Sequence, residues 1–155
     1  MAFGGLDGEA ASRLFSDTID VLGVNPDGKK FDKVDRIVGK SHECDVDVML
    51  DVANEPFPVR KDEKLVMLLT TTLRRDGKPE EEWDATAKAD SLLDDYEYGM
   101  HGKVFKVEHT ADGLVGVLVS FGGLLLVMKG RPEHLKKLSL DQRIFLLAKK
   151  GIGVA

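Results

Sequence analysis

The chain has 155 residues, of which 43% are hydrophobic and 32% charged, and its formal net charge is −5. This length suits one domain with a real hydrophobic core. The acidic balance weighs against a free-standing nucleic-acid binder, whose affinity depends on clustered lysine and arginine, although it leaves room for a local basic groove. The only cysteine is Cys44, which excludes an intramolecular disulfide and a cysteine zinc site, and suits a reducing compartment such as cytosol or nucleus.

The first residues lack a basic segment followed by an apolar core, so they do not read as a secretory signal, and we expect residues 1–13 to form a flexible tail. A strand is predicted over residues 14–25, followed by a turn at Asn25-Pro-Asp-Gly28 and an extended segment over 31–38. Residues 23–30 also fit the pattern G-x-x-x-x-G-K. Lys30 stands where a phosphate-binding loop carries Ser or Thr, and no helix pattern follows, so we interpret the segment as a β-turn.

Residues 45–52 show the clearest alternation in the chain. Val46, Val48, Leu50 and Val52 fall on one face, and Asp45, Asp47 and Asp51 fall on the other. This pattern predicts a half-buried antiparallel strand with a solvated outer face. A shared metal ion is disfavoured, because Asp47 and Asp51 lie roughly 13 Å apart on a strand that rises about 3.3 Å per residue.

Another strand is predicted over residues 64–73, and the character of the chain then changes. Between Asp76 and Asp95 there are eight acidic residues and two lysines. We interpret residues 74–95 as a long acidic loop inserted between strands, with a helical turn near 85–90, because loops of this length in compact domains are functional or disordered. Strand character returns over residues 96–108, where a phase slip beside Gly99 and Gly102 indicates a bulge or a sharp bend.

Residues 114–128 hold no charged side chain in fifteen positions. As a helix this run would span roughly 22 Å at about 1.5 Å per residue, short of the about 30 Å hydrocarbon core of a membrane. Its three glycines would also destabilise a helix. We therefore predict a hairpin of strands 114–121 and 124–129 joined by Gly122-Gly123, and attribute the lack of charge to burial in a barrel wall.

One helical turn is expected at residues 132–138 and a last strand at 143–149. Seven or eight strands at short spacing, without a long amphipathic helix, predict an all-β antiparallel barrel. We assign residues 14–150 to this single domain and residues 151–155 to a C-terminal tail.

The motifs of common enzymes are missing. Ser120 lacks the first glycine of a nucleophile elbow, and none of His42, His101, His109 and His134 forms an i,i+4 pair with a glutamate. No acid and base residues stand out as a pair. The sequence therefore predicts no catalytic residue, no metal site and no cofactor.

Two stretches rich in lysine and arginine leave a nucleic-acid interpretation open. Small barrels bind single strands through basic grooves and stacked aromatics. Here acidic residues alternate with the basic ones and aromatics make up only 6%, which favours a solvated face of mixed charge. The basic residues are Lys29, Lys30, Lys33, Arg36 and Lys40 in the first stretch, and Lys136, Lys137, Arg143, Lys149 and Lys150 in the second.

The ordered segments together resemble a known family. They are LFSDTIDV, NPDGKKFDKVDRI, DVMLDV with a following FPV, YEYGMHGKVFKVE, VSFGGLLLVMKG and RIFLLAKK. In this order they closely resemble subunit eight shared by the eukaryotic nuclear RNA polymerases I, II and III, from about Leu14 to Lys150. The departures from that family's pattern are a longer N-terminal tail, an individual acidic loop and a GIGVA end.

The resemblance implies an antiparallel barrel related to the oligonucleotide-binding fold. It implies a non-catalytic subunit in the nucleus, including the nucleolus, packed on the outside of the enzyme against the largest subunit and neighbouring subunits. The nucleotide-adding chemistry and its magnesium would belong to the two large subunits. No cofactor, membrane or direct nucleic-acid contact is expected on this reading.

We expect docking through exposed strand edges and an apolar patch. Each aromatic candidate has an alternative role in the barrel core. A free-standing single-stranded nucleic-acid-binding barrel is the alternative function, and an enzyme is the third. The candidate interface residues are Phe31, Arg36, Tyr96, Tyr98, Met100, Phe121, Gly122, Gly123, Leu124 and Arg143.

Overall fold

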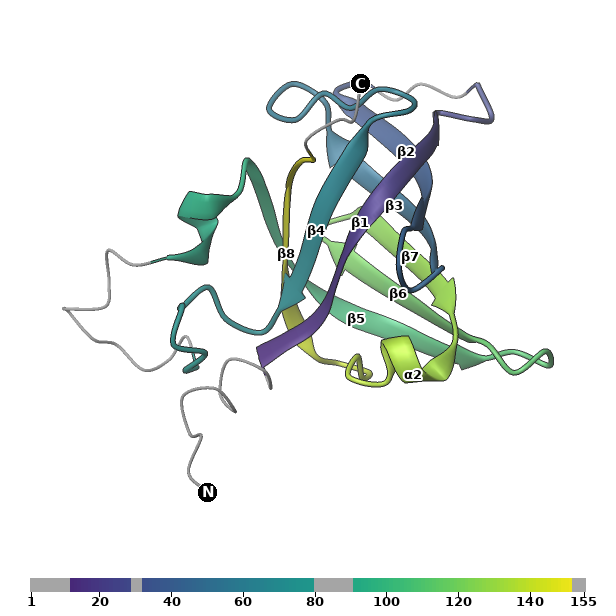
Figure 1. Ribbon diagram of the computed structural model, residues 1–155, viewed down its shortest axis with the longest axis vertical. Coiled ribbons are helices and arrows are strands. Elements are labelled where there is room, and N and C mark those ends of the chain that lie inside the picture. The colour runs from purple at the N-terminus through teal and green to yellow at the C-terminus, as the bar shows by residue number, and fades with distance from the viewer. Residues whose placement is uncertain (1–11, 29–31, 80–90, 152–155) are drawn as a thin grey trace.

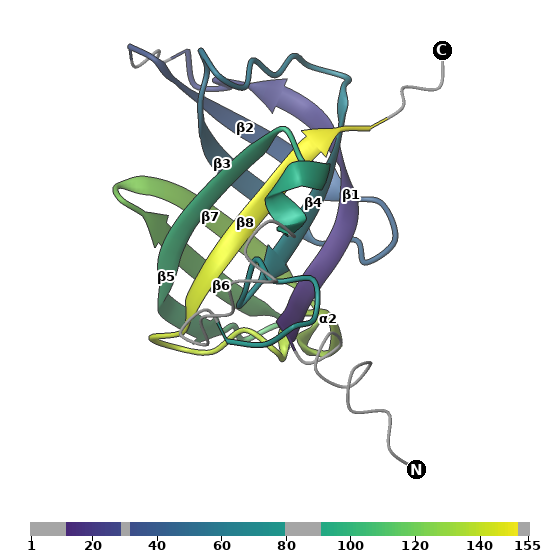
Figure 2. The same cartoon turned by 90° about the vertical axis from the view of Figure 1, so that its left-hand side faces the viewer.

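The computed structural model describes residues 12–28, 32–79 and 91–151. Within them the chain forms a closed antiparallel barrel of eight strands with almost no helix, which confirms the predicted fold class and is consistent with an oligonucleotide-binding type of barrel (Figures 1 and 2). No helix among these residues is long and apolar enough to cross a membrane. The strands are β1 (Arg13–Val24), β2 (Val34–Ser41), β3 (Asp47–Ala53), β4 (Lys64–Thr70), β5 (Tyr98–His109), β6 (Val115–Phe121), β7 (Leu124–Gly130) and β8 (Arg143–Lys150).

The barrel closes in the order β1-β2-β3-β7-β6-β5-β8-β4, with β4 returning to β1. Every strand therefore pairs with two neighbours. Closure satisfies the backbone groups that an open sheet leaves at its edges. None of the described strands is an edge strand throughout, but β1 pairs with β4 from Arg13 and with β2 only from Ile19, so docking through exposed strand edges stays a prediction.

Alternating side chains fill the barrel interior. On β3, Val48, Leu50 and Val52 point inward and are at most 3% exposed, as the sequence predicts. The β6–β7 hairpin is also confirmed, since Gly122 and Gly123 adopt the positive φ values of +64° and +103° that a tight hairpin turn requires. The short helix α2 (Pro132–Leu135) lies between β7 and β8 and buries Leu135.

Two strand ends differ from the prediction for local reasons. β4 stops at Thr70 because the Thr70 hydroxyl donates to the Thr72 carbonyl and accepts from the Thr72 amide, which turns the chain. β2 begins only at Val34, after Lys33 at φ +65°. The turn predicted at residues 25–28 is confirmed, with the Gly28 amide donating to the Asn25 carbonyl over 3.0 Å.

The predicted irregularity of β5 is present but lies elsewhere. The register with β6 shifts between Val104 and Lys106, leaving Phe105 45% exposed. Gly102 has another role: a Cβ there would lie 2.2 Å from the Ser120 carbonyl oxygen, so only glycine permits this approach of β5 to β6.

A second, small apolar cluster lies outside the barrel wall. The 3-10 helix η1 (Leu92–Asp95) places Leu92 on Leu68 of β4 and Leu147 of β8, beside Leu73 and Tyr96. In Figures 1 and 2 this short coil lies on the outer side of β8 and β4. The bridge between Arg74 and Ser91 joins the two ends of the acidic loop. Residues 80–90, with the predicted helical turn, lie outside the described residues, as do 1–11 and 152–155 of the two predicted tails.

Candidate docking surface

The predicted interface residues separate into core, flank and hairpin positions. Tyr98 is 9% exposed and Phe121 is 6% exposed, so both belong to the core. The Tyr98 ring stacks on Phe57 with centroids 5.0 Å apart, and its hydroxyl accepts a hydrogen bond from the Ala53 amide. In the isolated chain these two aromatics occupy the core role that the sequence left open as their alternative.

The Asp51 carboxylate joins three strands. Arg36 Nε lies 2.8 Å from Oδ1 of Asp51 and Arg36 Nη2 lies 3.2 Å from Oδ2, while the Leu125 amide donates to Oδ2 over 3.1 Å. The hydrogen bond to Asp51 raises the pKa of Arg36, against the opposing effect of burial. Asp51 is only 5% exposed, so the solvated outer face predicted for it is wrong: a long-range partner covers this carboxylate. Asp45 and Asp47 are exposed as predicted.

The other candidates lie on different sides of the barrel. Leu124 is half-buried beside the exposed Gly122-Gly123 turn, and Asp51 brings Arg36 to the same region through the Leu125 amide. Met100 is half-buried and packs against the core, whereas Arg143 is exposed opposite Lys103. Phe31 lies outside the described residues.

Tyr96 belongs to the η1 flank. It is half-buried there, and Lys149 Nζ lies 5.1 Å from its ring centroid. Burial raises the pKa of its hydroxyl. The structure therefore brings Arg36, the glycine turn and Leu124 together, and leaves Tyr96 and Arg143 elsewhere.

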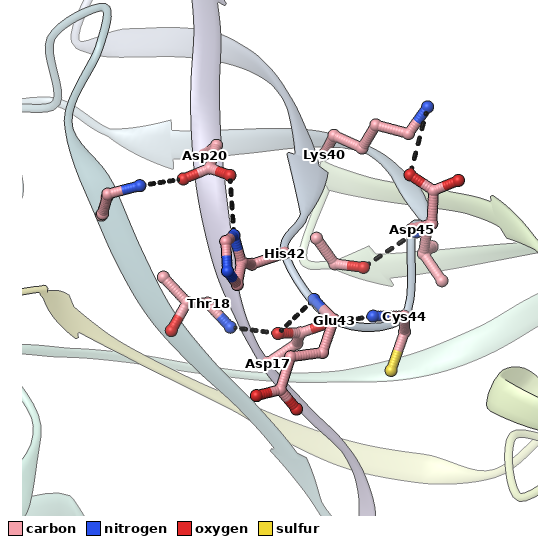
Figure 3. Close-up of polar contacts among 11 residues, drawn as sticks. Asp17, Thr18, Asp20, Lys40, His42, Glu43, Cys44 and Asp45 are labelled. Carbon is pink, nitrogen blue, oxygen red and sulfur yellow. Dashed lines mark hydrogen bonds and ion pairs between the residues drawn. The ribbon is translucent and has the colours of Figure 1, made fainter.

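A buried carboxylate pins the loop between β2 and β3. Asp17 of β1 accepts hydrogen bonds from the amides of Thr18, Glu43 and Cys44, the shortest of them 2.7 Å long (Figure 3). Burial alone would raise the pKa of Asp17, but these amides outweigh it and the net pKa is lowered. Burial, with nearby Asp17, raises the pKa of the Cys44 thiol, so it stays protonated and poorly nucleophilic at neutral pH.

Figure 3 also shows Asp20 beside His42. Its carboxylate forms an ion pair with Lys64 and lies 3.5 Å from Nδ1 of His42. The Lys64 hydrogen bond is the main reason that the pKa of Asp20 is lowered. Asp17 and Asp20 thus both tie β1 to its neighbours, which is a structural role.

No assembled reaction centre is found within residues 12–28, 32–79 and 91–151. In these ranges no group of three or more His, Cys, Asp or Glu side chains is placed to hold a metal ion, and every buried side-chain nitrogen or oxygen has a hydrogen-bond partner. An open depression lies between the start of β1, Cys44 and α2, lined by Arg13, Leu14, Cys44, His134, Lys136 and Lys137. Ser120 lies within β6 and accepts from the Gly123 amide, as expected for a hydroxyl in a strand.

An apolar row crosses the outer face of four neighbouring strands. Val38 pairs with Met49, Met49 with Val127, and Val127 with Leu118, so these side chains stand next to one another. All four alternate with core residues along their strands and are half-buried. We call Val38, Met49, Leu118 and Val127 the outer apolar row.

Sequence reasoning missed this row, because it follows from strand register, which no local pattern encodes. One signal was present: a strand with one wet face should alternate, and residues 114–128 carry no charge on either face. Burial in the barrel wall explains only the inward half of that run. Leu118, Leu125 and Val127 belong to the outward half.

Comparison with protein families matches residues 16–150 to the family described as RNA polymerase Rpb8. The chain belongs to this family. The match begins within β1 and ends with β8, so it includes the hairpin turn, Arg36 and the outer apolar row.

Curated relatives of the Rpb8 family agree over nearly the whole chain. The chain is 40% identical to the DNA-directed RNA polymerases I, II, and III subunit rpabc3 of Dictyostelium discoideum, over 90% of this chain and 99% of that protein. It is 40% identical to the DNA-directed RNA polymerases II, IV and V subunit 8B of Arabidopsis thaliana, over 88% and 95%. Identity to the corresponding subunit RPABC3 of Saccharomyces cerevisiae is 32%, over 88% and 98%.

Proposed function

We propose that this chain is a non-catalytic structural subunit common to DNA-directed RNA polymerases I, II and III, that it docks on their largest subunit, and that it supports transcription in the nucleus and nucleolus. Membership of the Rpb8 family over residues 16–150 carries this proposal. Its relatives are named for two different sets of polymerases, I, II and III in one case and II, IV and V in another, so the shared member, polymerase II, is the first partner to test.

The chemistry of the described residues supports a structural role. Their buried carboxylates, Asp17 and Asp51, are used to hold a loop and to join strands. The reaction and its metal ions would then reside in other subunits. The candidate docking residues remain Arg36, Tyr96, Met100, Gly122, Gly123, Leu124 and Arg143, with Phe31 beyond the described part and Tyr98 and Phe121 acting from the core.

Affinity purification tests this function. The tagged chain is expressed in cells of its own organism at its natural level. It is captured on an affinity resin and washed at rising salt concentrations. We expect the largest subunits of polymerases I, II and III to stay bound in washes of up to about 1 M salt. At that concentration the screening length is only about 3 Å, so contacts between exposed charges are largely lost. An unrelated tagged barrel serves as the control. Recovery of the chain without any largest subunit would contradict the proposal.

A further inference from the structure

The outer apolar row is only half-buried, whereas comparable residues elsewhere on the barrel wall are fully covered. Leu68 and Leu147 also point outward from the barrel, yet η1 covers them and they are 2% and 0% exposed. The row's side chains are half-buried and are not among the residues packed against the core. Its end at β1 adds Leu22, the extra residue of a bulge opposite Val38, which is 56% exposed. An apolar strip left open on a barrel wall is typical of an interaction site.

We propose, building on the function proposed above, that the outer apolar row is the surface through which this chain seats on a concave apolar surface of the largest polymerase subunit. The row lies on the wall formed by β2, β3, β7 and β6, away from η1 (Figure 1). Beside it, Arg36 and Asp51 neutralise each other, so the neighbouring Leu125 extends the apolar strip.

The flanking charges favour a protein partner. On the other side of the row, Lys40 pairs in register with Asp47, and Asp47 with Lys129, so the sign alternates from strand to strand. A nucleic-acid backbone selects a continuous positive track. An alternating track instead fits a protein partner with an acidic, a basic and an acidic side chain opposite Lys40, Asp47 and Lys129. Such pairing fixes the register of the complex.

The shape argues against a second copy of this chain. The row runs across the convex outside of a barrel, and two convex walls of the same kind touch only along a narrow line. Four half-buried side chains also fall far short of the about 800 Å² that each partner contributes to a standard interface. A concave partner can cover the row together with its charged rim.

Two substitutions test the row in the intact polymerase. Val127→Lys places an ammonium in the middle of the row, and Lys129→Glu reverses one charge of the rim at an exposed position. The matched control is Leu140→Lys, because Leu140 is 58% exposed and lies outside the row. Each tagged variant is expressed beside wild type, and the recovered largest subunit is measured per tagged chain. Urea unfolding of each purified variant shows whether it folds.

We expect at least about a tenfold loss of largest subunit with Val127→Lys, because a charge would be buried without a partner, a smaller loss with Lys129→Glu, and no loss with Leu140→Lys. Wild-type recovery for both Val127→Lys and Lys129→Glu would overturn the inference while leaving the proposed function intact. Failure of wild type itself would overturn the function. If Val127→Lys does not fold, Lys129→Glu decides the matter. A free chain that dimerises, with the dimer abolished by Val127→Lys, would assign the row to a second copy and overturn the proposal.

Discussion

At the residue scale, the carboxylate of Asp17 has a structural role that the sequence did not indicate. It accepts hydrogen bonds from the amides of Thr18, Glu43 and Cys44. Asp17→Asn replaces one of the acceptor oxygens by an NH₂ donor that faces those amides. We expect a loss of about 1–3 kcal/mol in the free energy of unfolding at neutral pH, measured by urea denaturation. Asp45→Asn, in the same loop but with an exposed side chain, should change it by less than about 0.5 kcal/mol.

The lowered pKa of Asp17 predicts that the effect of Asp17→Asn on stability depends on pH. The pKa of Asp17 is lowered in the folded protein from its ordinary value of 3.8. The charged carboxylate therefore contributes stability that is present above the unfolded pKa and is lost as the pH falls through the folded one. The difference between wild type and Asp17→Asn should shrink as urea curves are recorded from neutral pH down through this acidic range. A difference that grows with acidity would contradict this assignment.

Gly102 provides a second test at this scale. An alanine Cβ would lie 2.2 Å from the Ser120 carbonyl oxygen, a backbone atom that cannot move without separating β5 from β6. We expect Gly102→Ala to lower the free energy of unfolding by at least about 1–3 kcal/mol, as overpacking does. Gly23→Ala is the control within β1, where nothing lies within 4 Å of a new Cβ. Equal stability of the two variants, by thermal unfolding, would show that β5 adapts.

At the scale of elements, Leu92 is the buried residue through which η1 packs on the barrel wall. Leu92 is 6% exposed against Leu68 and Leu147, whereas its neighbour Leu93 is 42% exposed. We expect Leu92→Ala to cost about 2–5 kcal/mol and Leu93→Ala about 1 kcal/mol or less, by urea unfolding. Limited proteolysis adds a readout, since Leu92→Ala should speed cleavage at 91–97 more than Leu93→Ala does. Equal cleavage would contradict this anchoring role.

Local patterns predicted most elements because their causes are local. The alternation at Val46–Val52 and the positive φ required at Gly122-Gly123 both act within a few residues. The burial of Asp51 was not predicted by the same reasoning, since its partner Arg36 lies fifteen residues away in the chain. The outer apolar row was also beyond reach, because strand register decides which side chains become neighbours.

At the scale of the whole molecule, several cations within the described residues already form ion pairs. Arg36 binds Asp51, Lys40 lies 3.5 Å from Asp45, and Lys150 Nζ lies 3.0 Å from Glu63. These cations belong to the two basic stretches that motivated the nucleic-acid alternative. Each neutralised pair removes one counterion-releasing contact from any such groove, and the net charge of −5 repels a polyanion further.

This pairing predicts weak binding of single-stranded DNA by the free chain. We expect fluorescence anisotropy with a labelled oligothymidylate to give a Kd no tighter than about 10⁻⁴ M at physiological salt, the weak end of the non-specific range. Lowering the salt from about 200 mM to about 50 mM should strengthen binding only slightly, because few phosphate contacts form and the slope scales with their number. Micromolar binding with a steep slope would instead favour the alternative of a nucleic-acid-binding barrel, since such a slope requires several lysines and arginines that the ion pairs leave available.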